Sequence, residues 1–405
     1  MNAKTITTAP AAIFFLVLPY GISSGFATVT LPFLLVQHGF SVSAAASITA
    51  LGLSANIWRF VWAPLTDLTL SLHKWYLIGL SFCATTLLLL CFTPLNNNAT
   101  GYLSFIVLFS QIAGTFVVAP VGGFMAKTVS EEKKGRAGGW YQAGNLGGMG
   151  IGGGAGIWLS IHFSYHIAGV ALSIAMLACA AALYFVPQVH SEKEKTLKER
   201  FKLIAFDIRD LFRSPIAIFT TAMIMTPIGI GAAAYIWSSV GKDWHVTADT
   251  VALVTGLLSG GVSAVGCVFG GWVADKLGRW WAFFGSGTLM ALVTLGISIF
   301  AFTPFTYITG VLFYAFMFGF ANAAFSAVVL HAIGKGMAAT KYALLSSISN
   351  IAPVYMTIYD GWLYDKYDIK AMLLGETFLG LGFVVISLFI LSQTKLNRIR
   401  AEHIA

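Results

Sequence analysis

SEKEKTLKERFKLIAFDIRDLFR, residues 191–213, is the longest polar interruption in a chain of 405 residues. The rest of the chain is very apolar, because 57% of all residues are hydrophobic, only 10% are charged and the mean hydropathy is +0.80. Soluble globular domains carry about 25% charged residues. The composition therefore excludes a soluble domain and predicts an integral membrane protein that this interruption divides into two parts.

Runs of about 20 apolar residues, the length that crosses a bilayer core of roughly 30 Å, occur on both sides of the interruption. Six runs precede it and six follow it, near 11–37, 43–66, 75–94, 101–125, 136–162, 164–187, 215–240, 249–274, 280–301, 304–333, 341–364 and 370–392. The sequence therefore predicts an all-α integral membrane protein of twelve transmembrane helices. They form an N-terminal six-helix bundle at 1–187 and a C-terminal six-helix bundle at 215–392.

The segment between the bundles, residues 188–214, is predicted to be a cytoplasmic linker, and residues 393–405 are predicted to be a cytoplasmic tail. Within the linker, apolar residues recur at helical spacing and basic residues are available for the opposite face. The apolar positions are Leu197, Phe201, Ile204, Ile208 and Leu211. We expect an amphipathic helix that lies on the inner membrane surface. A helix that docks a partner protein is the alternative.

The formal net charge of +8 follows the alternation of the loops. Twenty of the 24 lysines and arginines fall in segments on the same side as the N-terminus, and only Lys242, Lys366 and Lys370 fall on the other side. Cytoplasmic loops carry such an excess of basic residues. We therefore expect a multi-pass protein of the cell inner (plasma) membrane with both termini in the cytoplasm, and no nucleic-acid partner.

The two predicted bundles carry matching positions. Pro19 in the first apolar run matches Pro227 in the seventh, and Asp67 after the second run matches Asp275 after the eighth; both pairs are 208 residues apart. Helix-breaking residues in equivalent helices of two membrane halves indicate a central site at which helices bend or backbone groups are freed. The common spacing predicts that the bundles are copies of one six-helix unit.

The loop after the eighth run, GWVADKLGR at residues 271–279, resembles the signature loop of the major facilitator superfamily, a GxxxD, basic, xG, basic pattern. An ordinary loop rich in positive charge is the alternative, but twelve predicted spans and a middle linker favour the superfamily. The resemblance implies the major facilitator fold. It also implies a cytoplasmic gate of Asp67, Asp275, Lys276 and Arg279, in which Asp275 and Arg279 meet the opposing bundle and stabilise the outward-facing state.

Other stretches resemble one branch of that superfamily, which includes AmpG muropeptide permeases, acetyl-coenzyme A transporters and certain siderophore permeases. RFVWAPLTD at 59–67 resembles the branch's basic-F-x-W-x-P-x-x-D segment, GISSG at 21–25 its GxxSG, and TKYALLSS at 340–347 its T-x-[FY]-A-L-x-S pattern. However, the fourth predicted helix lacks the two acids that the branch carries there, and Asn145 and Leu146 replace a Tyr-Arg pair. A muropeptide substrate is therefore not expected.

Polar residues in the apolar runs are the candidates for binding a solute. If the resemblance sets the arrangement, helices 1, 2, 4, 5, 7, 8, 10 and 11 line a central cavity, whereas 3, 6, 9 and 12 support it. The candidates on the lining helices are Arg59, Gln111, Asn145, Asn350, Tyr20, Ser23 and Ser24. Hydrogen bonding between helices is the alternative role of the amides. His331 is a weaker candidate, because it lies near the inner interface.

Three charged residues in the predicted helices need an explanation. Arg59 costs about 2.5–3.5 kcal/mol to place in the hydrocarbon layer on insertion scales. We expect it to face a water-filled cavity and to bind an anionic group through a forked contact; snorkelling to the inner interface is the alternative. Asp360, near the outer end of the eleventh helix, is a candidate for proton coupling. Glu376 is on the twelfth helix, a support helix, and is expected to be a structural partner.

The chain shows no carboxylate pair, nucleophile triad or metal cluster typical of an enzyme, and its four cysteines lie in apolar runs without CxxC spacing. The glycine-rich stretch at 147–156 has no preceding strand of the kind that a phosphate-binding loop needs, so it predicts close helix packing. We therefore expect no catalytic activity, no metal and no cofactor.

The function predicted from these features is secondary active transport of a small, anionic or amphipathic solute by alternating access, with protons as the coupling ion. Its partners are the solute and the lipid bilayer, and the protein is expected to be a monomer. A permease-like sensor, which binds its ligand without sustained transport, is the alternative. Saturable flux supports the transporter, whereas binding without flux supports the sensor.

Overall fold

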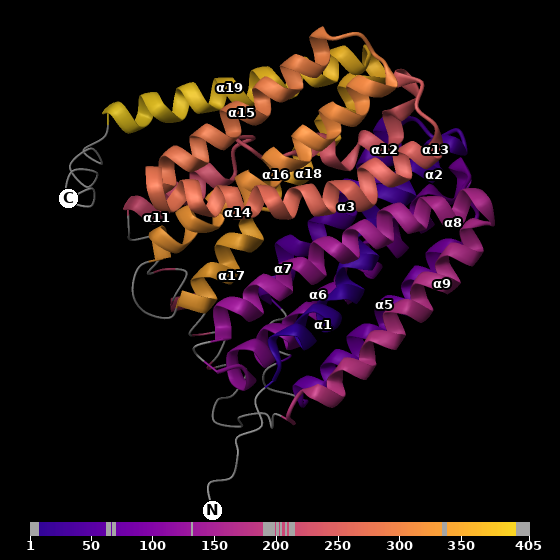
Figure 1. Ribbon diagram of the computed structural model, residues 1–405, viewed down its shortest axis with the longest axis vertical. Coiled ribbons are helices and arrows are strands. Elements are labelled where there is room, and N and C mark those ends of the chain that lie inside the picture. The colour runs from indigo at the N-terminus through magenta and orange to yellow at the C-terminus, as the bar shows by residue number, and fades with distance from the viewer. Residues whose placement is uncertain are drawn as a thin grey trace, which may run out of the picture.

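The computed structural model describes residues 8–393 apart from 62–65, 67–69, 131–132, 189–198, 200–201, 203–204, 207–208, 210–214 and 334–337. All regular structure in the described residues is helical, as predicted. The helices form two bundles that lie side by side, the N-terminal one in indigo to magenta and the C-terminal one in orange to yellow (Figure 1). The predicted linker, the tail and Asp67 lie largely or wholly outside the described residues.

The N-terminal half contains six predicted spans. Their elements are α1 (Pro10–Gly25), η1 (Phe26–Thr30) and α2 (Leu31–Gln37); α3 (Val42–Ser54) and η2 (Ala55–Trp58); α5 (Leu72–Phe92); η3 (Asn97–Ala99) and α6 (Thr100–Thr128); α7 (Lys134–Gly150), η5 (Ile151–Ala155) and α8 (Gly156–His162); and α9 (Tyr165–Ala178) and η6 (Cys179–Phe185). We call the side on which α2 ends the outer side, as the charge distribution predicts.

The C-terminal half contains the other six. Their elements are α11 (Pro215–Ile224), η7 (Ala232–Tyr235) and α12 (Trp237–Val240), followed by η8 (Gly241–Trp244); α13 (Ala248–Val251), η9 (Ala252–Leu258) and α14 (Ser259–Leu277); α15 (Arg279–Ile299); α16 (Pro304–Ile333); α17 (Ala338–Ile348) and α18 (Ile351–Lys366); and α19 (Ile369–Gln393). The elements α12 and α13 flank the outer loop that joins the seventh and eighth spans.

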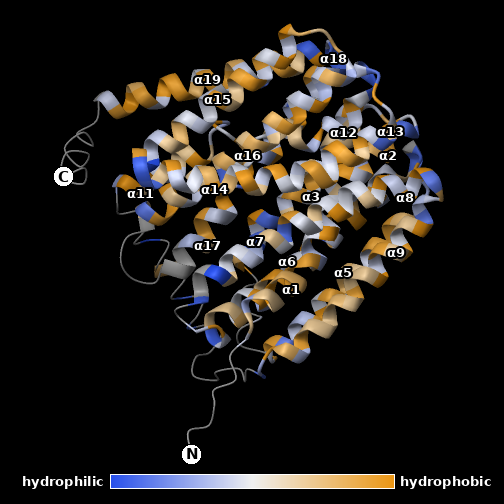
Figure 2. Ribbon diagram, viewed as in Figure 1, coloured by the Kyte–Doolittle hydropathy of each residue, from blue (hydrophilic) through white to orange (hydrophobic). Residues whose placement is uncertain are grey.

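Four of the predicted lining spans differ from all other spans in their apolar character. Eight helical stretches of the described residues are long and apolar enough to cross a membrane, and they correspond to predicted spans 1, 3, 4, 6, 8, 9, 10 and 12. The other four predicted spans, 2, 5, 7 and 11, are interrupted or less apolar, and all four are expected to line the cavity. Figure 2 shows this contrast, since α9 is mostly orange whereas α7 carries white and blue.

Glycines let the first and fifth spans pack backbone against backbone. A Cβ added at Gly152 would lie 2.0 Å from the carbonyl oxygen of Ile22, and one added at Gly148 would lie 2.5 Å from that of Leu18. The hydroxyl of Thr30 donates hydrogen bonds of 2.8 Å to the carbonyls of Gly152 and Gly153. The prediction that this glycine-rich stretch serves close helix packing is confirmed.

The seventh span is broken in its middle. The helix α11 ends at Ile224, and the next helical residues are those of η7. Pro227 lacks the amide hydrogen that a helix needs, and Gly231 has a φ of 70°, in the left-handed region that favours glycine. Tyr355 donates a hydrogen bond of 2.9 Å to the freed carbonyl of Met225. By contrast, Pro19 lies inside α1, which continues to Gly25.

Candidate functional site

A cavity of about 70 Å³ lies between the two halves of the molecule. Its walls come from the first and fifth spans of one half and from the seventh, eighth and tenth spans of the other. They include Thr28, Leu146, Met149, Tyr235, Thr255, Ser259, Tyr314 and Phe318. A water needs about 10–15 Å³ of cavity space measured with a water-sized sphere. The cavity therefore has room for several waters.

The outer ends of the second and eleventh spans are joined by Asp365. Its carboxylate accepts hydrogen bonds from the backbone N–H groups of Val42 (3.1 Å) and Ser43 (2.8 Å), at the first turn of α3. The first amides of a helix have no partner inside the helix, and the helix dipole favours a negative charge there. The first and seventh spans are also joined, because Ser238 donates a hydrogen bond of 2.8 Å to the carbonyl of Val29.

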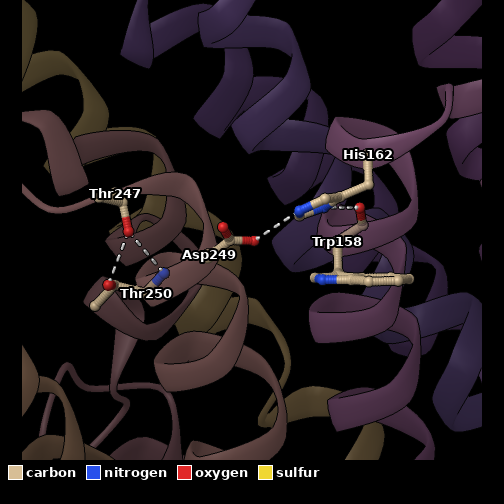
Figure 3. A network of polar contacts seen from close by, with 5 residues as sticks. All are labelled: Trp158, His162, Thr247, Asp249 and Thr250. Atoms are coloured by element: carbon tan, nitrogen blue, oxygen red, sulfur yellow. Dashed lines mark hydrogen bonds and ion pairs between the residues drawn. The ribbon is translucent and has the colours of Figure 1, made fainter.

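A third contact joins the outer ends of the fifth and eighth spans (Figure 3). His162 of α8 lies 3.7 Å from the carboxylate of Asp249 in α13 and stacks on the ring of Trp158. Thr247 caps α13 by accepting a hydrogen bond from the N–H of Thr250. The ion pair is solvent-exposed, and such pairs contribute about 0.2–1 kcal/mol. It is therefore a minor part of the outer closure.

A close backbone approach of the two halves lies at the cavity, where η5 meets η9. A Cβ added at Gly256 would lie 2.3 Å from both Cα and N of Gly154. The two backbones therefore touch at a point where no side chain larger than hydrogen fits. Together with the contacts of Asp365 and Ser238, this crossing holds the outer parts of the two halves together.

We predict that Asp365→Ala opens the outer side more often. Loss of a carboxylate that caps helix amides costs about 1 kcal/mol, and here the cost falls only on the closed state, so the open population should rise about fivefold. The test is the rate at which an impermeant maleimide labels a cysteine placed at Ser43. Asp368→Ala is the control, because Asp368 caps α19 within its own half. Equal labelling rates in both variants would contradict the prediction.

Arg59 lies within electrostatic range of tyrosines from other spans. Its charge acts on the hydroxyls of Tyr20 in α1 and Tyr141 in α7. Tyr141 also interacts with Tyr342 of α17, and Tyr20 with Tyr235 of η7. We call these five residues the Arg59 cluster. The cluster brings together side chains from the first, second, fifth, seventh and eleventh spans, and Arg59 itself is only partly exposed.

Two of the predicted binding residues contact each other. The amide of Gln111 donates to the carbonyl of Ser23 (3.3 Å) and to its hydroxyl (3.4 Å), and the hydroxyls of Ser23 and Ser110 are 3.1 Å apart. Gln111, Ser23 and the neighbouring Ser24 are all buried. The contacts of Gln111 thus tie the fourth span to the first, which is the alternative role considered for the amides.

The remaining predicted residues lie in different settings. Tyr20 donates a hydrogen bond of 3.1 Å to Oδ1 of Asn56. Asn350 lies at the break between α17 and α18 and donates to the carbonyl of Ser346 at 2.6 Å. The buried Oδ1 of Asn145 has no hydrogen-bond partner in the described part of the chain. Of the three, Asn145 thus offers an acceptor that no described protein group uses.

The predicted gating residues Asp275, Lys276 and Arg279 are exposed at the junction of α14 and α15. Arg279 donates a hydrogen bond of 2.7 Å to Nδ1 of His331, in the same half. Within the described ranges, Asp275 has no ion-pair partner. An inner pairing with the opposing bundle therefore stays a prediction for the state in which the inner side is closed.

Asp360 and Glu376 lie together in the C-terminal half. Asp360 of α18 is fully buried, and the two carboxyl groups interact electrostatically. Glu376 of α19 accepts a hydrogen bond from the hydroxyl of Tyr314, a residue that lines the cavity. The support helix α19 thus contributes an acid to the interior, beside the acid on a lining helix.

The sequence analysis did not single out Tyr141, Tyr235, Tyr342 or Asn322. The side chain of Asn322 is exposed in the middle of α16 and donates to the carbonyl of Phe318. The feature that could have identified these four residues is a polar side-chain atom in the interior of an apolar run. That signal is weak for tyrosine, because tyrosine is also common at membrane interfaces.

Comparison with known proteins gives one family. The model of the Major Facilitator Superfamily matches residues 13–357, most of the chain. No curated protein matches the sequence.

Solved structures with the same arrangement include three transport proteins. A point mutant of the nucleoside transporter NupG has a TM-score of 0.72 at 13% identity, over 93% of this chain and 98% of that one. A D-xylose-proton symporter has a TM-score of 0.68 at 14% identity, over 94% and 95%. Tetrameric PepTSo2 has a TM-score of 0.71 at 12% identity, over 96% and 98%. At these identities the likeness shows the fold alone.

Proposed function

The chain belongs to the Major Facilitator Superfamily, and from this premise we propose that it moves a small anionic or amphipathic solute across the cell inner membrane by alternating access. Membership makes it a multi-pass membrane transporter and not an enzyme. The proposed solute site lies between the two six-helix bundles, and the cavity found there supports this position. Membership of the AmpG-like branch is a proposal, since the resemblance to that branch rests on short segments.

The Arg59 cluster is the observation that supports an anionic solute. A guanidinium within the membrane needs water, an acid or an anion to offset its cost of about 2.5–3.5 kcal/mol. In the described part of the chain, the charge of Arg59 acts on the hydroxyls of Tyr20 and Tyr141, which do not supply a formal negative charge at neutral pH. A carboxylate or phosphate would receive the forked donors of Arg59 and the tyrosine hydroxyls.

The walls of the cavity support a solute with an apolar part. Met149 and Phe318 face the same space as Thr28 and Tyr235. Binding sites of this kind combine apolar walls with a few polar groups that fix orientation. Tyr235 is the member of the Arg59 cluster that lines this cavity. The proposed solute therefore has a partly apolar body in the cavity and one anionic group that extends past Tyr235 toward Arg59.

The contacts between the halves on the outer side support alternating access. To open it, the contacts of Asp365 with α3 and the crossing of Gly154 with Gly256 must separate. The inner gate of Asp67, Asp275, Lys276 and Arg279 would form in exchange. Both termini are proposed to be cytoplasmic and the protein to be a monomer. Proton coupling through Asp360 is also proposed; one structurally similar protein is a proton symporter.

Uptake into proteoliposomes tests this function. The purified protein is reconstituted and offered labelled small carboxylates and organic phosphates, each beside its neutral amide or alcohol analogue. We expect saturable uptake of at least one anion and none of its neutral analogue, because only the anion can occupy the Arg59 cluster. Ligand binding without flux would contradict transport and favour a sensor. Preferred uptake of the neutral analogues would contradict the anionic site.

A further inference from the structure

Two buried carboxyl groups lie outside the Arg59 cluster, in the outer half of the C-terminal bundle. Asp360 is 0% exposed and Glu376 is 7% exposed. Both oxygens of Asp360 and Oε2 of Glu376 have no hydrogen-bond partner in the described part of the chain. A buried carboxylate without a partner is very costly, and two of them side by side repel each other. The burial of both acids and their unpartnered oxygens therefore favour one negative charge on the pair over two.

One oxygen of the pair is connected to the cavity. Oε1 of Glu376 accepts a hydrogen bond from the hydroxyl of Tyr314, and that hydroxyl accepts one of 3.2 Å from the N–H of Ala233. Tyr314 lines the cavity between the halves. Ala233 belongs to η7, where the broken seventh span resumes. The acid pair thus reaches the solute cavity through Tyr314, and it reaches the irregular seventh span both through Tyr314 and through the backbone N–H groups of Ala232 and Ala233 that face Glu376.

We propose that Asp360 and Glu376 form one proton-binding site, and that Tyr314 links its occupancy to the solute cavity. The proton binds to Asp360, which then no longer repels the charge of Glu376, while Oε1 of Glu376 keeps its bond from Tyr314. No other bond forms or breaks, and the proton returns to water on release. The link to transport rests on the proposed function, whereas the proton site does not.

The helix that carries Asp360 also carries the outer closure. Asp360 and Asp365 are five residues apart on α18, about 7.5 Å along the helix axis. When the proton leaves, repulsion between Asp360 and Glu376 acts between α18 and α19, and through α18 on the contact of Asp365 with α3. The other titratable groups that interact with the pair are Tyr314 and Tyr359. Proton release should therefore favour opening of the outer side.

Infrared spectroscopy of the purified full-length protein in lipid tests the proton site without any solute. We expect a carboxylic acid C=O band that persists at neutral pH and shifts in D₂O. Asp360→Asn should remove it, whereas Asp249→Asn, at an exposed outer position, should leave it unchanged. Glu376→Gln gives a second test: the band should remain but disappear at lower pH than in wild type, because the neighbouring charge is gone. Absence of the band in wild type, or its survival in Asp360→Asn, would overturn the proposal.

Two further results separate this proposal from its alternatives. Loss of the band on adding sodium at constant pH would identify a metal-cation site and would also overturn it. Once a transported solute is known, Tyr314→Phe should keep the band but prevent a proton gradient from driving accumulation, while downhill uptake continues. If flux occurs and the band is absent, the transport function stands and the proton site fails. If the band is present without flux, the proton site stands and the transport function fails.

Discussion

Gly256→Ala is expected to produce a folded protein that no longer closes its outer side. The added Cβ would lie 2.3 Å from backbone atoms of Gly154, which no rotamer change can relieve. Alanine is otherwise favoured over glycine in a helix by about 1 kcal/mol, so the helix itself should not suffer. Overpacking costs about 1–3 kcal/mol, and this cost falls only on the closed state. The closed population should therefore decrease roughly 5- to 150-fold, and transport with it.

The control for this variant lies five residues further along the same span. A Cβ added at Gly261 has no heavy atom within 4 Å, so Gly261→Ala makes the same chemical change without a clash. Labelling of an outer cysteine by an impermeant reagent should accelerate in Gly256→Ala and stay at the wild-type rate in Gly261→Ala. If the two variants behave alike, the crossing of η5 and η9 is not part of the outer gate.

Arg59→Gln is expected to abolish solute binding. Each hydrogen bond to a charged group contributes about 1.5–3 kcal/mol, so loss of a forked pair should weaken affinity more than a hundredfold. Arg59→Lys keeps the charge but loses the fork. We expect its affinity to fall roughly tenfold or more, because one hydrogen bond to the anion is lost. The measurement is the affinity of purified protein for the anion that the uptake experiment identifies.

Two controls qualify this result. Lys366→Gln removes an exposed positive charge that lies over the ring of Trp362, far along the chain from the cluster, and should leave affinity unchanged. Tyr141→Phe removes a hydroxyl within electrostatic range of Arg59 and should weaken binding less than Arg59→Gln does. Wild-type affinity in Arg59→Gln would show that Arg59 does not contact the solute, which leaves snorkelling as its role.

The architecture could be predicted because each membrane span depends on the summed hydropathy of many residues. Twenty apolar residues must cross a bilayer as a helix, so hydropathy alone predicts the spans. Local chemistry likewise predicts the close packing of the fifth span, since glycine lacks a side chain. Proline lacks an amide hydrogen, but the break occurs only near Pro227, because the matching Pro19 lies inside the continuous helix α1.

The site residues depend on neighbours, and here prediction was incomplete. In a membrane helix the faces toward lipid and toward protein are both apolar, so the sequence does not reveal which way Tyr141 or Glu376 points. Glu376 was expected to be a structural partner because it is on a support helix, but the structure places it beside Asp360. Asp365 reaches amides more than 300 residues away in sequence, a contact that no local pattern encodes.

The most direct test of alternating access around a central site is a pair of distances across the halves. Spin labels at Asn98 and Ala301 report the outer ends of the fourth and tenth spans, and labels at Ala126 and Leu330 report their inner ends; all four positions are exposed. We predict two populations in lipid: one has a short outer and a long inner distance, and the other has a long outer and a short inner distance. Gly256→Ala should shift the balance toward the population with the long outer distance. A single distance at each end, unchanged in Gly256→Ala, would contradict the account.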